Sequence, residues 1–399
     1  MSAATPQTLP SEAVAVNAGG GGQRLLALDA FRGLTIAAMI LVNNPGSWGD
    51  LYWPLDHAPW HGWTPTDLVF PFFLFIVGTA LAYSLRKYRD GAGVAPAVYG
   101  RIARRTAVLI FLGWLPGLLL RSISYASGAA ATLDLATLRL PGVLVRIALV
   151  YLATSLVVLH TSVRTQIALA ATLLLGYWAL LAWLPNPGDY QANLSPDGNV
   201  ARVVDLALLG ESHLYTQAQR EKTDPEGLLS TLPAIATALL GYWTGLAIQR
   251  RGINGRTVAL LVSAGVACFA VGWAWGLVFP INKKLWTSSY VLLTGGLAMI
   301  VFAGALLKFD VGGWRRLARP WEIFGINAIF VFVASGLLAI LLARTRVGET
   351  STHDWIYGEF FTSWIADPKL SSLAFAAATV AFWWLVLWAM ARRGWTIRV

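Results

Sequence analysis

The most constraining feature of this sequence is a series of long apolar segments that recurs along almost the whole chain. The chain has 399 residues, 56% hydrophobic and only 13% charged, whereas a soluble domain carries about 25% charged residues. The apolar runs have the roughly 20-residue length of membrane-spanning helices and exceed the roughly 10-residue strands of a barrel. We therefore predict an all-α, polytopic membrane helix bundle. Its ten expected spans lie near residues 25–44, 65–85, 106–122, 141–160, 166–184, 231–249, 257–278, 287–307, 321–343 and 371–391.

The basic residues predict how the bundle is oriented. With these spans, the 30 Lys and Arg residues divide between two sets of loops on opposite sides of the membrane. The richer set includes residues 86–105, 250–256, 315–319 and 392–398, and such loops are normally cytoplasmic. Both termini are then cytoplasmic. Because orientation explains most of the net charge of +10, we expect no nucleic-acid partner.

The chain is predicted to contain one membrane domain. Residues 1–23 are expected to form a flexible cytoplasmic tail, because no charged segment precedes an apolar core as in a signal peptide. Residues 24–399 form the transmembrane domain, with a long external loop at 185–230. Within that loop, Asp224 and Pro225 resemble an N-cap and first position of a helix. A structural role and a functional role are equally open for Asp224 and Glu226.

Polar side chains concentrate between the first two apolar segments, in residues 28–78. Hydrocarbon tolerates such groups only where protein or a wet cavity surrounds them, so their presence at a membrane boundary indicates a functional site. We expect the reaction centre here. The polar residues of this connection are Asn43, Asn44, Asp56, His57, His61 and Asp67.

His57 is the favoured catalytic residue of this cluster. It lies between Asp56 and Asp67, and an imidazole accepts and returns protons near neutral pH. The spacing of His57 and His61 also suggests a metal site, but Pro59 interrupts a continuous helix and no third ligand is evident, so we expect no metal. Asp67 could cap the next helix or orient the histidine, and both roles can hold together.

Asn43 and Asn44 end the first span. Helix capping is the ordinary explanation, but an asparagine amide facing the histidines could also donate to a carbonyl oxygen that gains charge during acyl transfer. Lys283, in the segment PINKKLWTSS, could line the same external vestibule. Its alternative is to reach the lipid headgroups by snorkelling.

Two intramembrane arginines need partners. Arg32 lies one turn after Asp29, so the two form either a buried ion pair or a receptor for an anionic cofactor from the cytoplasm. Arg146 lies near the external end of its span. An arginine there requires a partner, and Asp67, Asp205 and a ligand all remain open.

Several motifs give the chain a recognisable identity. LDAFRGLTIAAMILVNN at 28–44 and HAPWHGWTPTDLVFPFFLFIVG at 57–78 resemble the opening of the heparan-α-glucosaminide N-acetyltransferase family. The resemblance continues through RLPGVLVRIALVY, DPEGLLSTLPAI, PINKKLWTSS and WEIFGINAIFVF in that order, and so covers nearly the whole chain after Arg24. It implies that the active-site histidine is His57, the asparagine before the turn Asn43, and the acid of the motif Asp67.

The resemblance implies a membrane enzyme that moves an acetyl group from cytoplasmic acetyl-CoA to the amine of a glucosamine-type sugar on the far side. Arg32, Arg104 and Arg105 are expected to hold the CoA nucleotide. Asn44, Arg146 and Lys283 are expected to contact the sugar. Compact bacterial members, which this chain resembles more closely, indicate a multi-pass protein of the bacterial inner membrane, for which a homodimer is also envisaged.

Two alternatives remain open at the level of sequence. The first is an inner-membrane transporter of N-acetylglucosamine or a related amino sugar, although paired broken helices, the usual sign of alternating access, are not evident. The second is acylation of a different acceptor, such as a polysaccharide hydroxyl.

Overall fold

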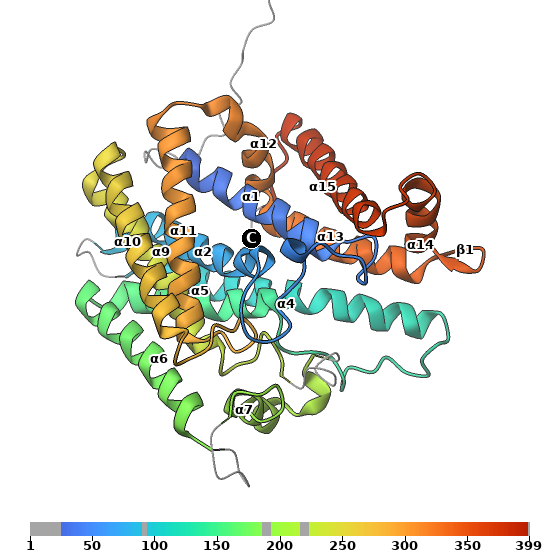
Figure 1. Cartoon of the computed structure of the whole chain (residues 1–399), viewed down its shortest axis with the longest axis horizontal. Coiled ribbons are helices and arrows are strands. Elements are labelled where there is room, and N and C mark those ends of the chain that lie inside the picture. The colour runs from blue at the N-terminus through green and yellow to red at the C-terminus, as the bar shows by residue number, and fades with distance from the viewer. Residues whose placement is uncertain (1–24, 90–93, 186–192, 216–222, 398–399) are drawn as a thin grey trace, which may run out of the picture.

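The chain folds into a helical bundle (Figure 1). The computed structural model describes residues 25–89, 94–185, 193–215 and 223–397, so the predicted tail at 1–23 and parts of the external loop lie outside the described residues. The elements in chain order are α1 (Leu26–Asn43), η1 (Trp53–Leu55), η2 (Pro65–Leu68), α2 (Val69–Ser84), α3 (Arg86–Arg89), α4 (Pro96–Ala126), α5 (Val143–His160), α6 (Val163–Trp183), α7 (Val200–Leu209), η3 (Glu211–His213), α9 (Thr231–Arg251), α10 (Gly255–Trp275), α11 (Ser288–Ala305), η4 (Leu306–Val311), α12 (Arg315–Ile326), α13 (Ala328–Arg344), β1 (Arg346–Val347), β2 (Thr350–Ser351), α14 (Thr352–Tyr357), η5 (Gly358–Thr362) and α15 (Pro368–Arg392).

The prediction of a polytopic helical membrane protein is confirmed. Nine helices of the described chain are long and apolar enough to cross a membrane, and there are ten if α12 and α13 count as one span. These two helices are bent by 65° at their junction, so the continuous helix predicted near 321–343 is wrong. The break falls at Asn327, whose side chain accepts a hydrogen bond from Ile397 N at 2.8 Å and donates to Trp395 O at 3.3 Å.

Glycines bring the central helices into very close contact. A Cβ atom at Gly78 of α2 would lie 1.8 Å from Ala238 O of α9, and one at Gly241 of α9 would lie 1.9 Å from Phe75 O. Thr79 Oγ1 also donates to Gly241 O at 3.0 Å. Small residues and interhelical hydrogen bonds are the usual means of packing helices in lipid, where no hydrophobic force draws them together. The helices α2 and α9 are therefore tightly packed against each other, and polar segments precede the N-termini of both.

The long loop between α6 and α9 contains further structure. Within residues 193–215 it forms α7 and η3, and α7 lies beside the C-terminal end of α6 at the lower edge of Figure 1. The starts of α2, α5, α9 and α11 all approach this end of the bundle, where the polar residues that precede them meet.

Candidate active site

Two distant loops are joined next to the start of α2. Gly62 N donates to Ile281 O at 2.7 Å, and Gly62 forms an isolated parallel bridge with Asn282. Gly62 has a φ of +100°, which favours glycine. Asn282 is fully buried, and its Oδ1 accepts a hydrogen bond from Leu285 N at 2.9 Å. This arrangement brings Lys283 beside His57.

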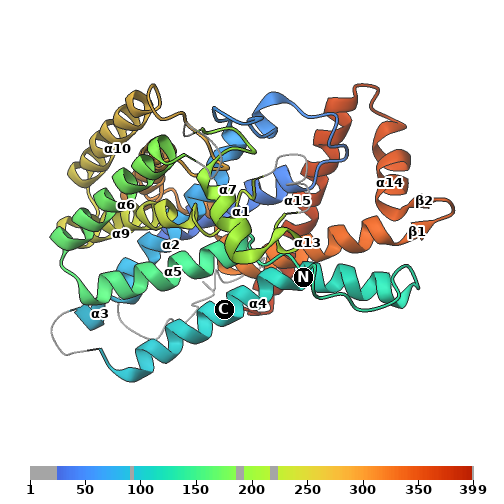
Figure 2. The same ribbon diagram turned by 90° about the horizontal axis from the view of Figure 1, so that it is seen from below.

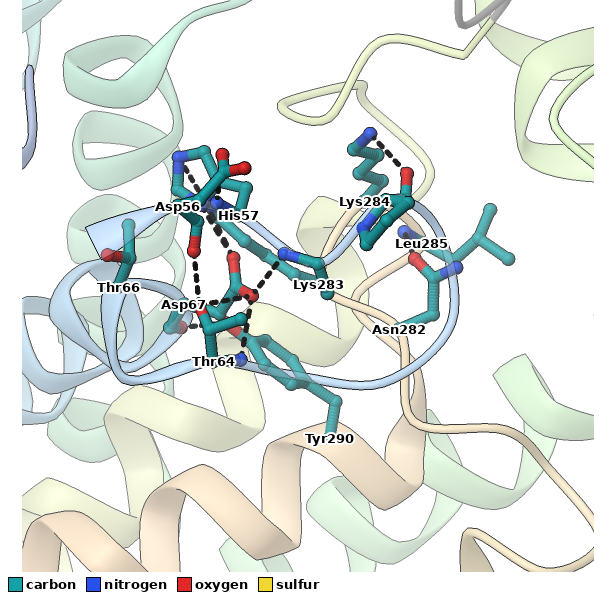
Figure 3. A network of polar contacts seen from close by, with 12 residues as sticks. Asp56, His57, Thr64, Thr66, Asp67, Asn282, Lys283, Lys284, Leu285 and Tyr290 are labelled. Carbon is teal, nitrogen blue, oxygen red and sulfur yellow. Dashed lines mark hydrogen bonds and ion pairs between the residues drawn. The ribbon is translucent and has the colours of Figure 1, made fainter. Parts of the chain in front are cut away.

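His57 and Asp67 are in direct contact (Figure 3). His57 Nδ1 lies 2.7 Å from Asp67 Oδ1, and the Asp67 side chain is 1% exposed while that of His57 is 42% exposed. A carboxylate accepts at this distance, so the contact assigns the neutral imidazole proton to Nδ1. The lone pair of Nε2 is then available to a substrate.

The local fold explains why Asp67 points at the histidine. Thr64 and Asp67 form a capping box at the start of η2, in which Asp67 Oδ2 accepts from Thr64 N at 3.0 Å. The same oxygen accepts from Ala58 N at 3.0 Å, and the Asp67 carbonyl oxygen accepts from the Tyr290 hydroxyl. Asp67 therefore caps a helix and contacts His57 at once.

Lys283 completes this charged group. Its Nζ lies 3.0 Å from Nδ1 and 3.3 Å from Nε2 of His57, and 3.4 Å from Asp67 Oδ1. The two ring nitrogens point in different directions in the plane of the ring. An amine nearly equidistant from both therefore lies against the face of the ring rather than in line with either nitrogen. Burial lowers the pKa of Lys283, and the Asp67 charge opposes this effect.

His61 belongs to the scaffold of the site. Its Nδ1 accepts a hydrogen bond from Asn282 Nδ2 at 3.3 Å, and burial lowers its pKa. Among the described residues, no group of three or more His, Cys, Asp or Glu side chains could hold a metal ion.

Arg146 contacts the turn before α9 and the ring of Trp286, next to the site. It is 1% exposed and donates to Gly227 O at 3.0 Å and to Ser230 Oγ, so its hydrogen bonds go to a turn rather than to Asp67 or Asp205. Its guanidinium lies 5.0 Å from the Trp286 ring, which packs against Tyr290. Trp286 has a φ of 51°, a rare and strained value for a large residue.

The turn that Arg146 binds does not begin a helix. The span predicted from residue 231 is confirmed, because α9 begins at Thr231, whereas the helix start suggested at Asp224 is wrong. Asp224 instead accepts two hydrogen bonds from Arg139, at 2.6 and 3.1 Å, and Glu226 accepts a third at 2.6 Å. The Asp224 side chain is fully buried, so the ion pair fixes this segment. No role was predicted for Arg139. The only sequence feature that marks it is its place as the first residue of RLPGVLVRIALVY.

Asp205 of α7 holds the same turn from the other side. Its Oδ1 accepts from Leu228 N at 2.9 Å and Leu229 N at 3.2 Å, and Oδ2 is buried without a partner among the described residues. Burial raises the pKa of Asp205 to about 6, whereas the two backbone hydrogen bonds oppose that rise.

The raised pKa of Asp205 predicts a pH-dependent stability. The folded protein holds this proton more tightly than the unfolded chain, whose Asp has a pKa of 3.8, so the stabilisation is complete below that value and is lost as pH rises through about 6. Thermal unfolding should therefore show this loss between about pH 4 and 6, and Asp205→Asn should not. Parallel pH profiles of the two proteins would contradict the assignment.

Asn43 and Asn44 lie away from the His57 group, at the C-terminal end of α1. Asn44 Nδ2 donates to Ile40 O at 2.8 Å, as a helix-ending residue does. Both asparagines line a groove of about 1060 Å³ together with His353 and Asp354. The structure therefore does not place them against the His57 ring, which is contacted instead by Asp67 and Lys283.

Arg32 and Arg105 share a cavity of about 290 Å³ among α1, α2, α4, α5, α12 and α13. Arg32 Nη1 lies 3.3 Å from Asp29 Oδ1, so the predicted ion pair forms. Arg105 lies 4.7 Å over the Tyr151 ring. Arg104 is exposed on α4 and does not line the cavity.

A separate void of only about 10 Å³ lies between α1, α2, α5 and α13. It shares Phe73, Ile147 and Ile329 with the larger cavity as lining residues, and it also touches Met39 and Val143. Val143 is the first residue of α5, so this void lies on the side of the larger cavity that faces the N-terminal end of α5.

Comparison with curated proteins finds two similar sequences. The chain is 29% identical over 359 residues to heparan-alpha-glucosaminide N-acetyltransferase of Homo sapiens, covering 78% of this chain and 52% of the relative. It is 29% identical over 364 residues to the enzyme of the same name from Mus musculus, covering 79% and 54%. The chain thus spans about half the length of the curated relatives it matches. No protein-family model matches it.

Proposed function

Because the chain is a relative of the heparan-alpha-glucosaminide N-acetyltransferases, we propose that it is a transmembrane acetyltransferase. It moves an acetyl group from cytoplasmic acetyl-CoA to the amine of a glucosamine-type sugar on the external side. The observation that carries this proposal is the group of His57, Asp67 and Lys283, whose polar atoms lie within 3.4 Å of one another. The distribution of basic loops supports cytoplasmic termini and an inner-membrane location.

In the proposed reaction, His57 Nε2 takes a proton from the sugar amine as its nitrogen attacks the thioester carbonyl. The C–N bond forms, the C–S bond breaks, and the proton passes to the departing thiolate of CoA. Asp67, bonded to Nδ1, stabilises the imidazolium that forms in between. In the two-step variant, Nε2 attacks the thioester, the C–S bond breaks and the CoA thiolate leaves. The amine then attacks the acetyl-imidazole, the bond from the acetyl carbon to Nε2 breaks, and the amine proton passes to the thiolate.

The carbonyl oxygen gains negative charge in either variant and needs a donor. Lys283 already lies within 3.3 Å of both ring nitrogens of His57, so we assign it this role. Asn43, at the end of α1, is the second proposed donor. Asn44 and Arg146 are proposed to act on the sugar side, Arg146 through the turn that it holds.

Acetyl-CoA is the proposed donor, and the cytoplasmic cavity is the proposed entry for it. Arg32 and Arg105 supply positive charge for its phosphates, and Arg104 adds charge on the exposed face of α4. Guanidinium groups are well suited to phosphate oxygens. The void beyond them, next to Phe73 and Ile147, has only about 10 Å³, so entry of the pantetheine arm requires these side chains to move.

The test is product analysis with labelled acetyl-CoA and a panel of amino and hydroxyl sugars. N-acetylated glucosamine is the expected product. The bent pair α12 and α13 favours a second candidate, a transporter of N-acetylglucosamine, because broken helices occur in transporters. If proteoliposomes take up that sugar without acetyl-CoA, and the labelled acetyl-CoA assay gives no acetylated product, the transporter function is supported and the acetyltransferase function is rejected.

Lys283→Met should lower kcat by about 10²- to 10³-fold, as expected for the loss of one donor to an oxyanion. The KM for acetyl-CoA should change little, because Lys283 lies on the other side of the bundle from Arg32. Lys284→Met is the matched control, since Lys284 Nζ donates to Pro59 O at 2.8 Å. Equal losses in the two variants would exclude a specific role for Lys283.

A further inference from the structure

The groove that contains Asn43 and Asn44 is separate from the His57 group. Its lining residues come mainly from α13, α14 and α15, which lie in the same part of the bundle in Figure 2. The loop of residues 44–48 closes one end. Its volume of about 1060 Å³ lies at the upper end of the usual range for small-molecule sites.

The groove is polar at one end and apolar along its walls. Asn44, Ser47, His353 and Asp354 lie at the outer end, where His353 Nδ1 lies 3.0 Å from Asp354 Oδ1. The walls are formed by residues 335–343 of α13 and 375–383 of α15. Each wall is about 12 Å long at 1.5 Å per residue, comparable with the roughly 15 Å of one leaflet.

We propose that the groove holds the apolar chain of a lipid-linked amino sugar, with the sugar at the Asn44 and Asp354 end. This inference rests on the proposed acetyltransferase function and names the class of its acceptor. A free sugar has no apolar part to occupy walls of Leu338, Leu342 and Phe382. A lipid chain reaches these walls directly from the bilayer, since α13 and α15 belong to the membrane-crossing helices.

The charge at the polar end also suits an amine. The Asp354 side chain is 68% exposed, and its hydrogen bond to His353 lowers its pKa, so it remains an anion that can attract the ammonium of an amino sugar. The rim formed by residues 44–48 is continuous in sequence with the loop that carries His57. The sugar end of the groove therefore adjoins the segment that leads to the reaction centre.

The experiment compares acetylation of methyl glucosaminide and dodecyl glucosaminide, which carry the same amine. The wild-type protein should prefer the dodecyl sugar by at least about tenfold in kcat/KM, as expected from burial of several methylenes. Ala378→Trp, which fills the groove, should remove this preference and leave methyl glucosaminide within about twofold. Ala377→Trp is the matched control, because Ala377 is exposed next to it but does not line the groove.

The outcomes separate the two proposals. Acetylation of both sugars with equal kcat/KM, or equal effects of the two tryptophans, overturns the lipid-linked acceptor and leaves the transferase intact. If neither sugar is acetylated, the transferase fails, and crosslinking of a diazirine-bearing dodecyl glucosaminide decides on the groove. Labelling of α13 or α15 supports it, and labelling elsewhere overturns it. If Ala378→Trp does not fold, Ala339→Phe on the opposite wall replaces it.

Discussion

His57→Ala should abolish acetyl transfer while leaving the protein folded. Its imidazole is 42% exposed and held by Asp67 at 2.7 Å, so its removal leaves no large internal cavity but removes the only proposed base. Loss of a general base typically lowers the rate by about 10²- to 10⁴-fold. The loss should appear in kcat of glucosamine acetylation, with unchanged affinity for CoA, because the proposed CoA cavity does not include His57.

His61→Ala is the matched control for this variant. His61 lies on the same loop but contacts Asn282 rather than Asp67, so it should retain most of the activity. The assignment of His57 fails if purified His57→Ala protein acetylates glucosamine at the wild-type rate. It also fails if both histidine variants lose activity equally.

Arg139→Ala should strongly destabilise the external segment before α9. In this variant two carboxylates lose the cation that they share. Asp224 is fully buried, and Glu226 is 10% exposed. Breaking a buried ion pair from one side costs about 3 to 5 kcal/mol. Arg139 itself is 28% exposed, so we expect the lower part of this range. Thermal or denaturant unfolding in detergent would measure the loss.

Two further variants separate charge from packing. Arg121→Ala should cost little, because Arg121 donates to the carbonyl oxygens of Asp134 and Thr137 at an exposed site. In the double variant Arg139→Ala with Asp224→Asn, the stranded charge is absent and part of the stability should return. Without that return, packing of Arg139 over the Tyr215 ring, 4.4 Å away, would be the larger contribution.

The spans could be predicted from sequence because hydrocarbon thickness fixes their length and composition. The break at Asn327 could not, since its side chain binds backbone atoms of residues 395 and 397, 68 and 70 positions away. The start of α9 at Thr231 agrees with the span predicted from residue 231. The helix start suggested at Asp224 did not form: its carboxylate accepts from Glu226 N in a turn and is paired with Arg139, 85 positions upstream, a partner that no local pattern reveals.

The site shows the same division between near and distant partners. His57 and Asp67 are ten positions apart on one loop, so their contact could be expected from spacing. Lys283 is 226 positions from His57, and contacts between their two loops, such as the backbone bridge between Gly62 and Asn282, bring them together. The position of Asn44 in a separate groove depends on α13 and α15, which no local pattern near residue 44 reveals.

The contacts between the loops of Gly62 and Asn282 couple the two proposed catalytic groups. His57 and Lys283 belong to different loops, so their separation of 3.0 Å depends on those contacts. A substitution that separates the loops should therefore lower acetyl transfer although both side chains remain in the chain.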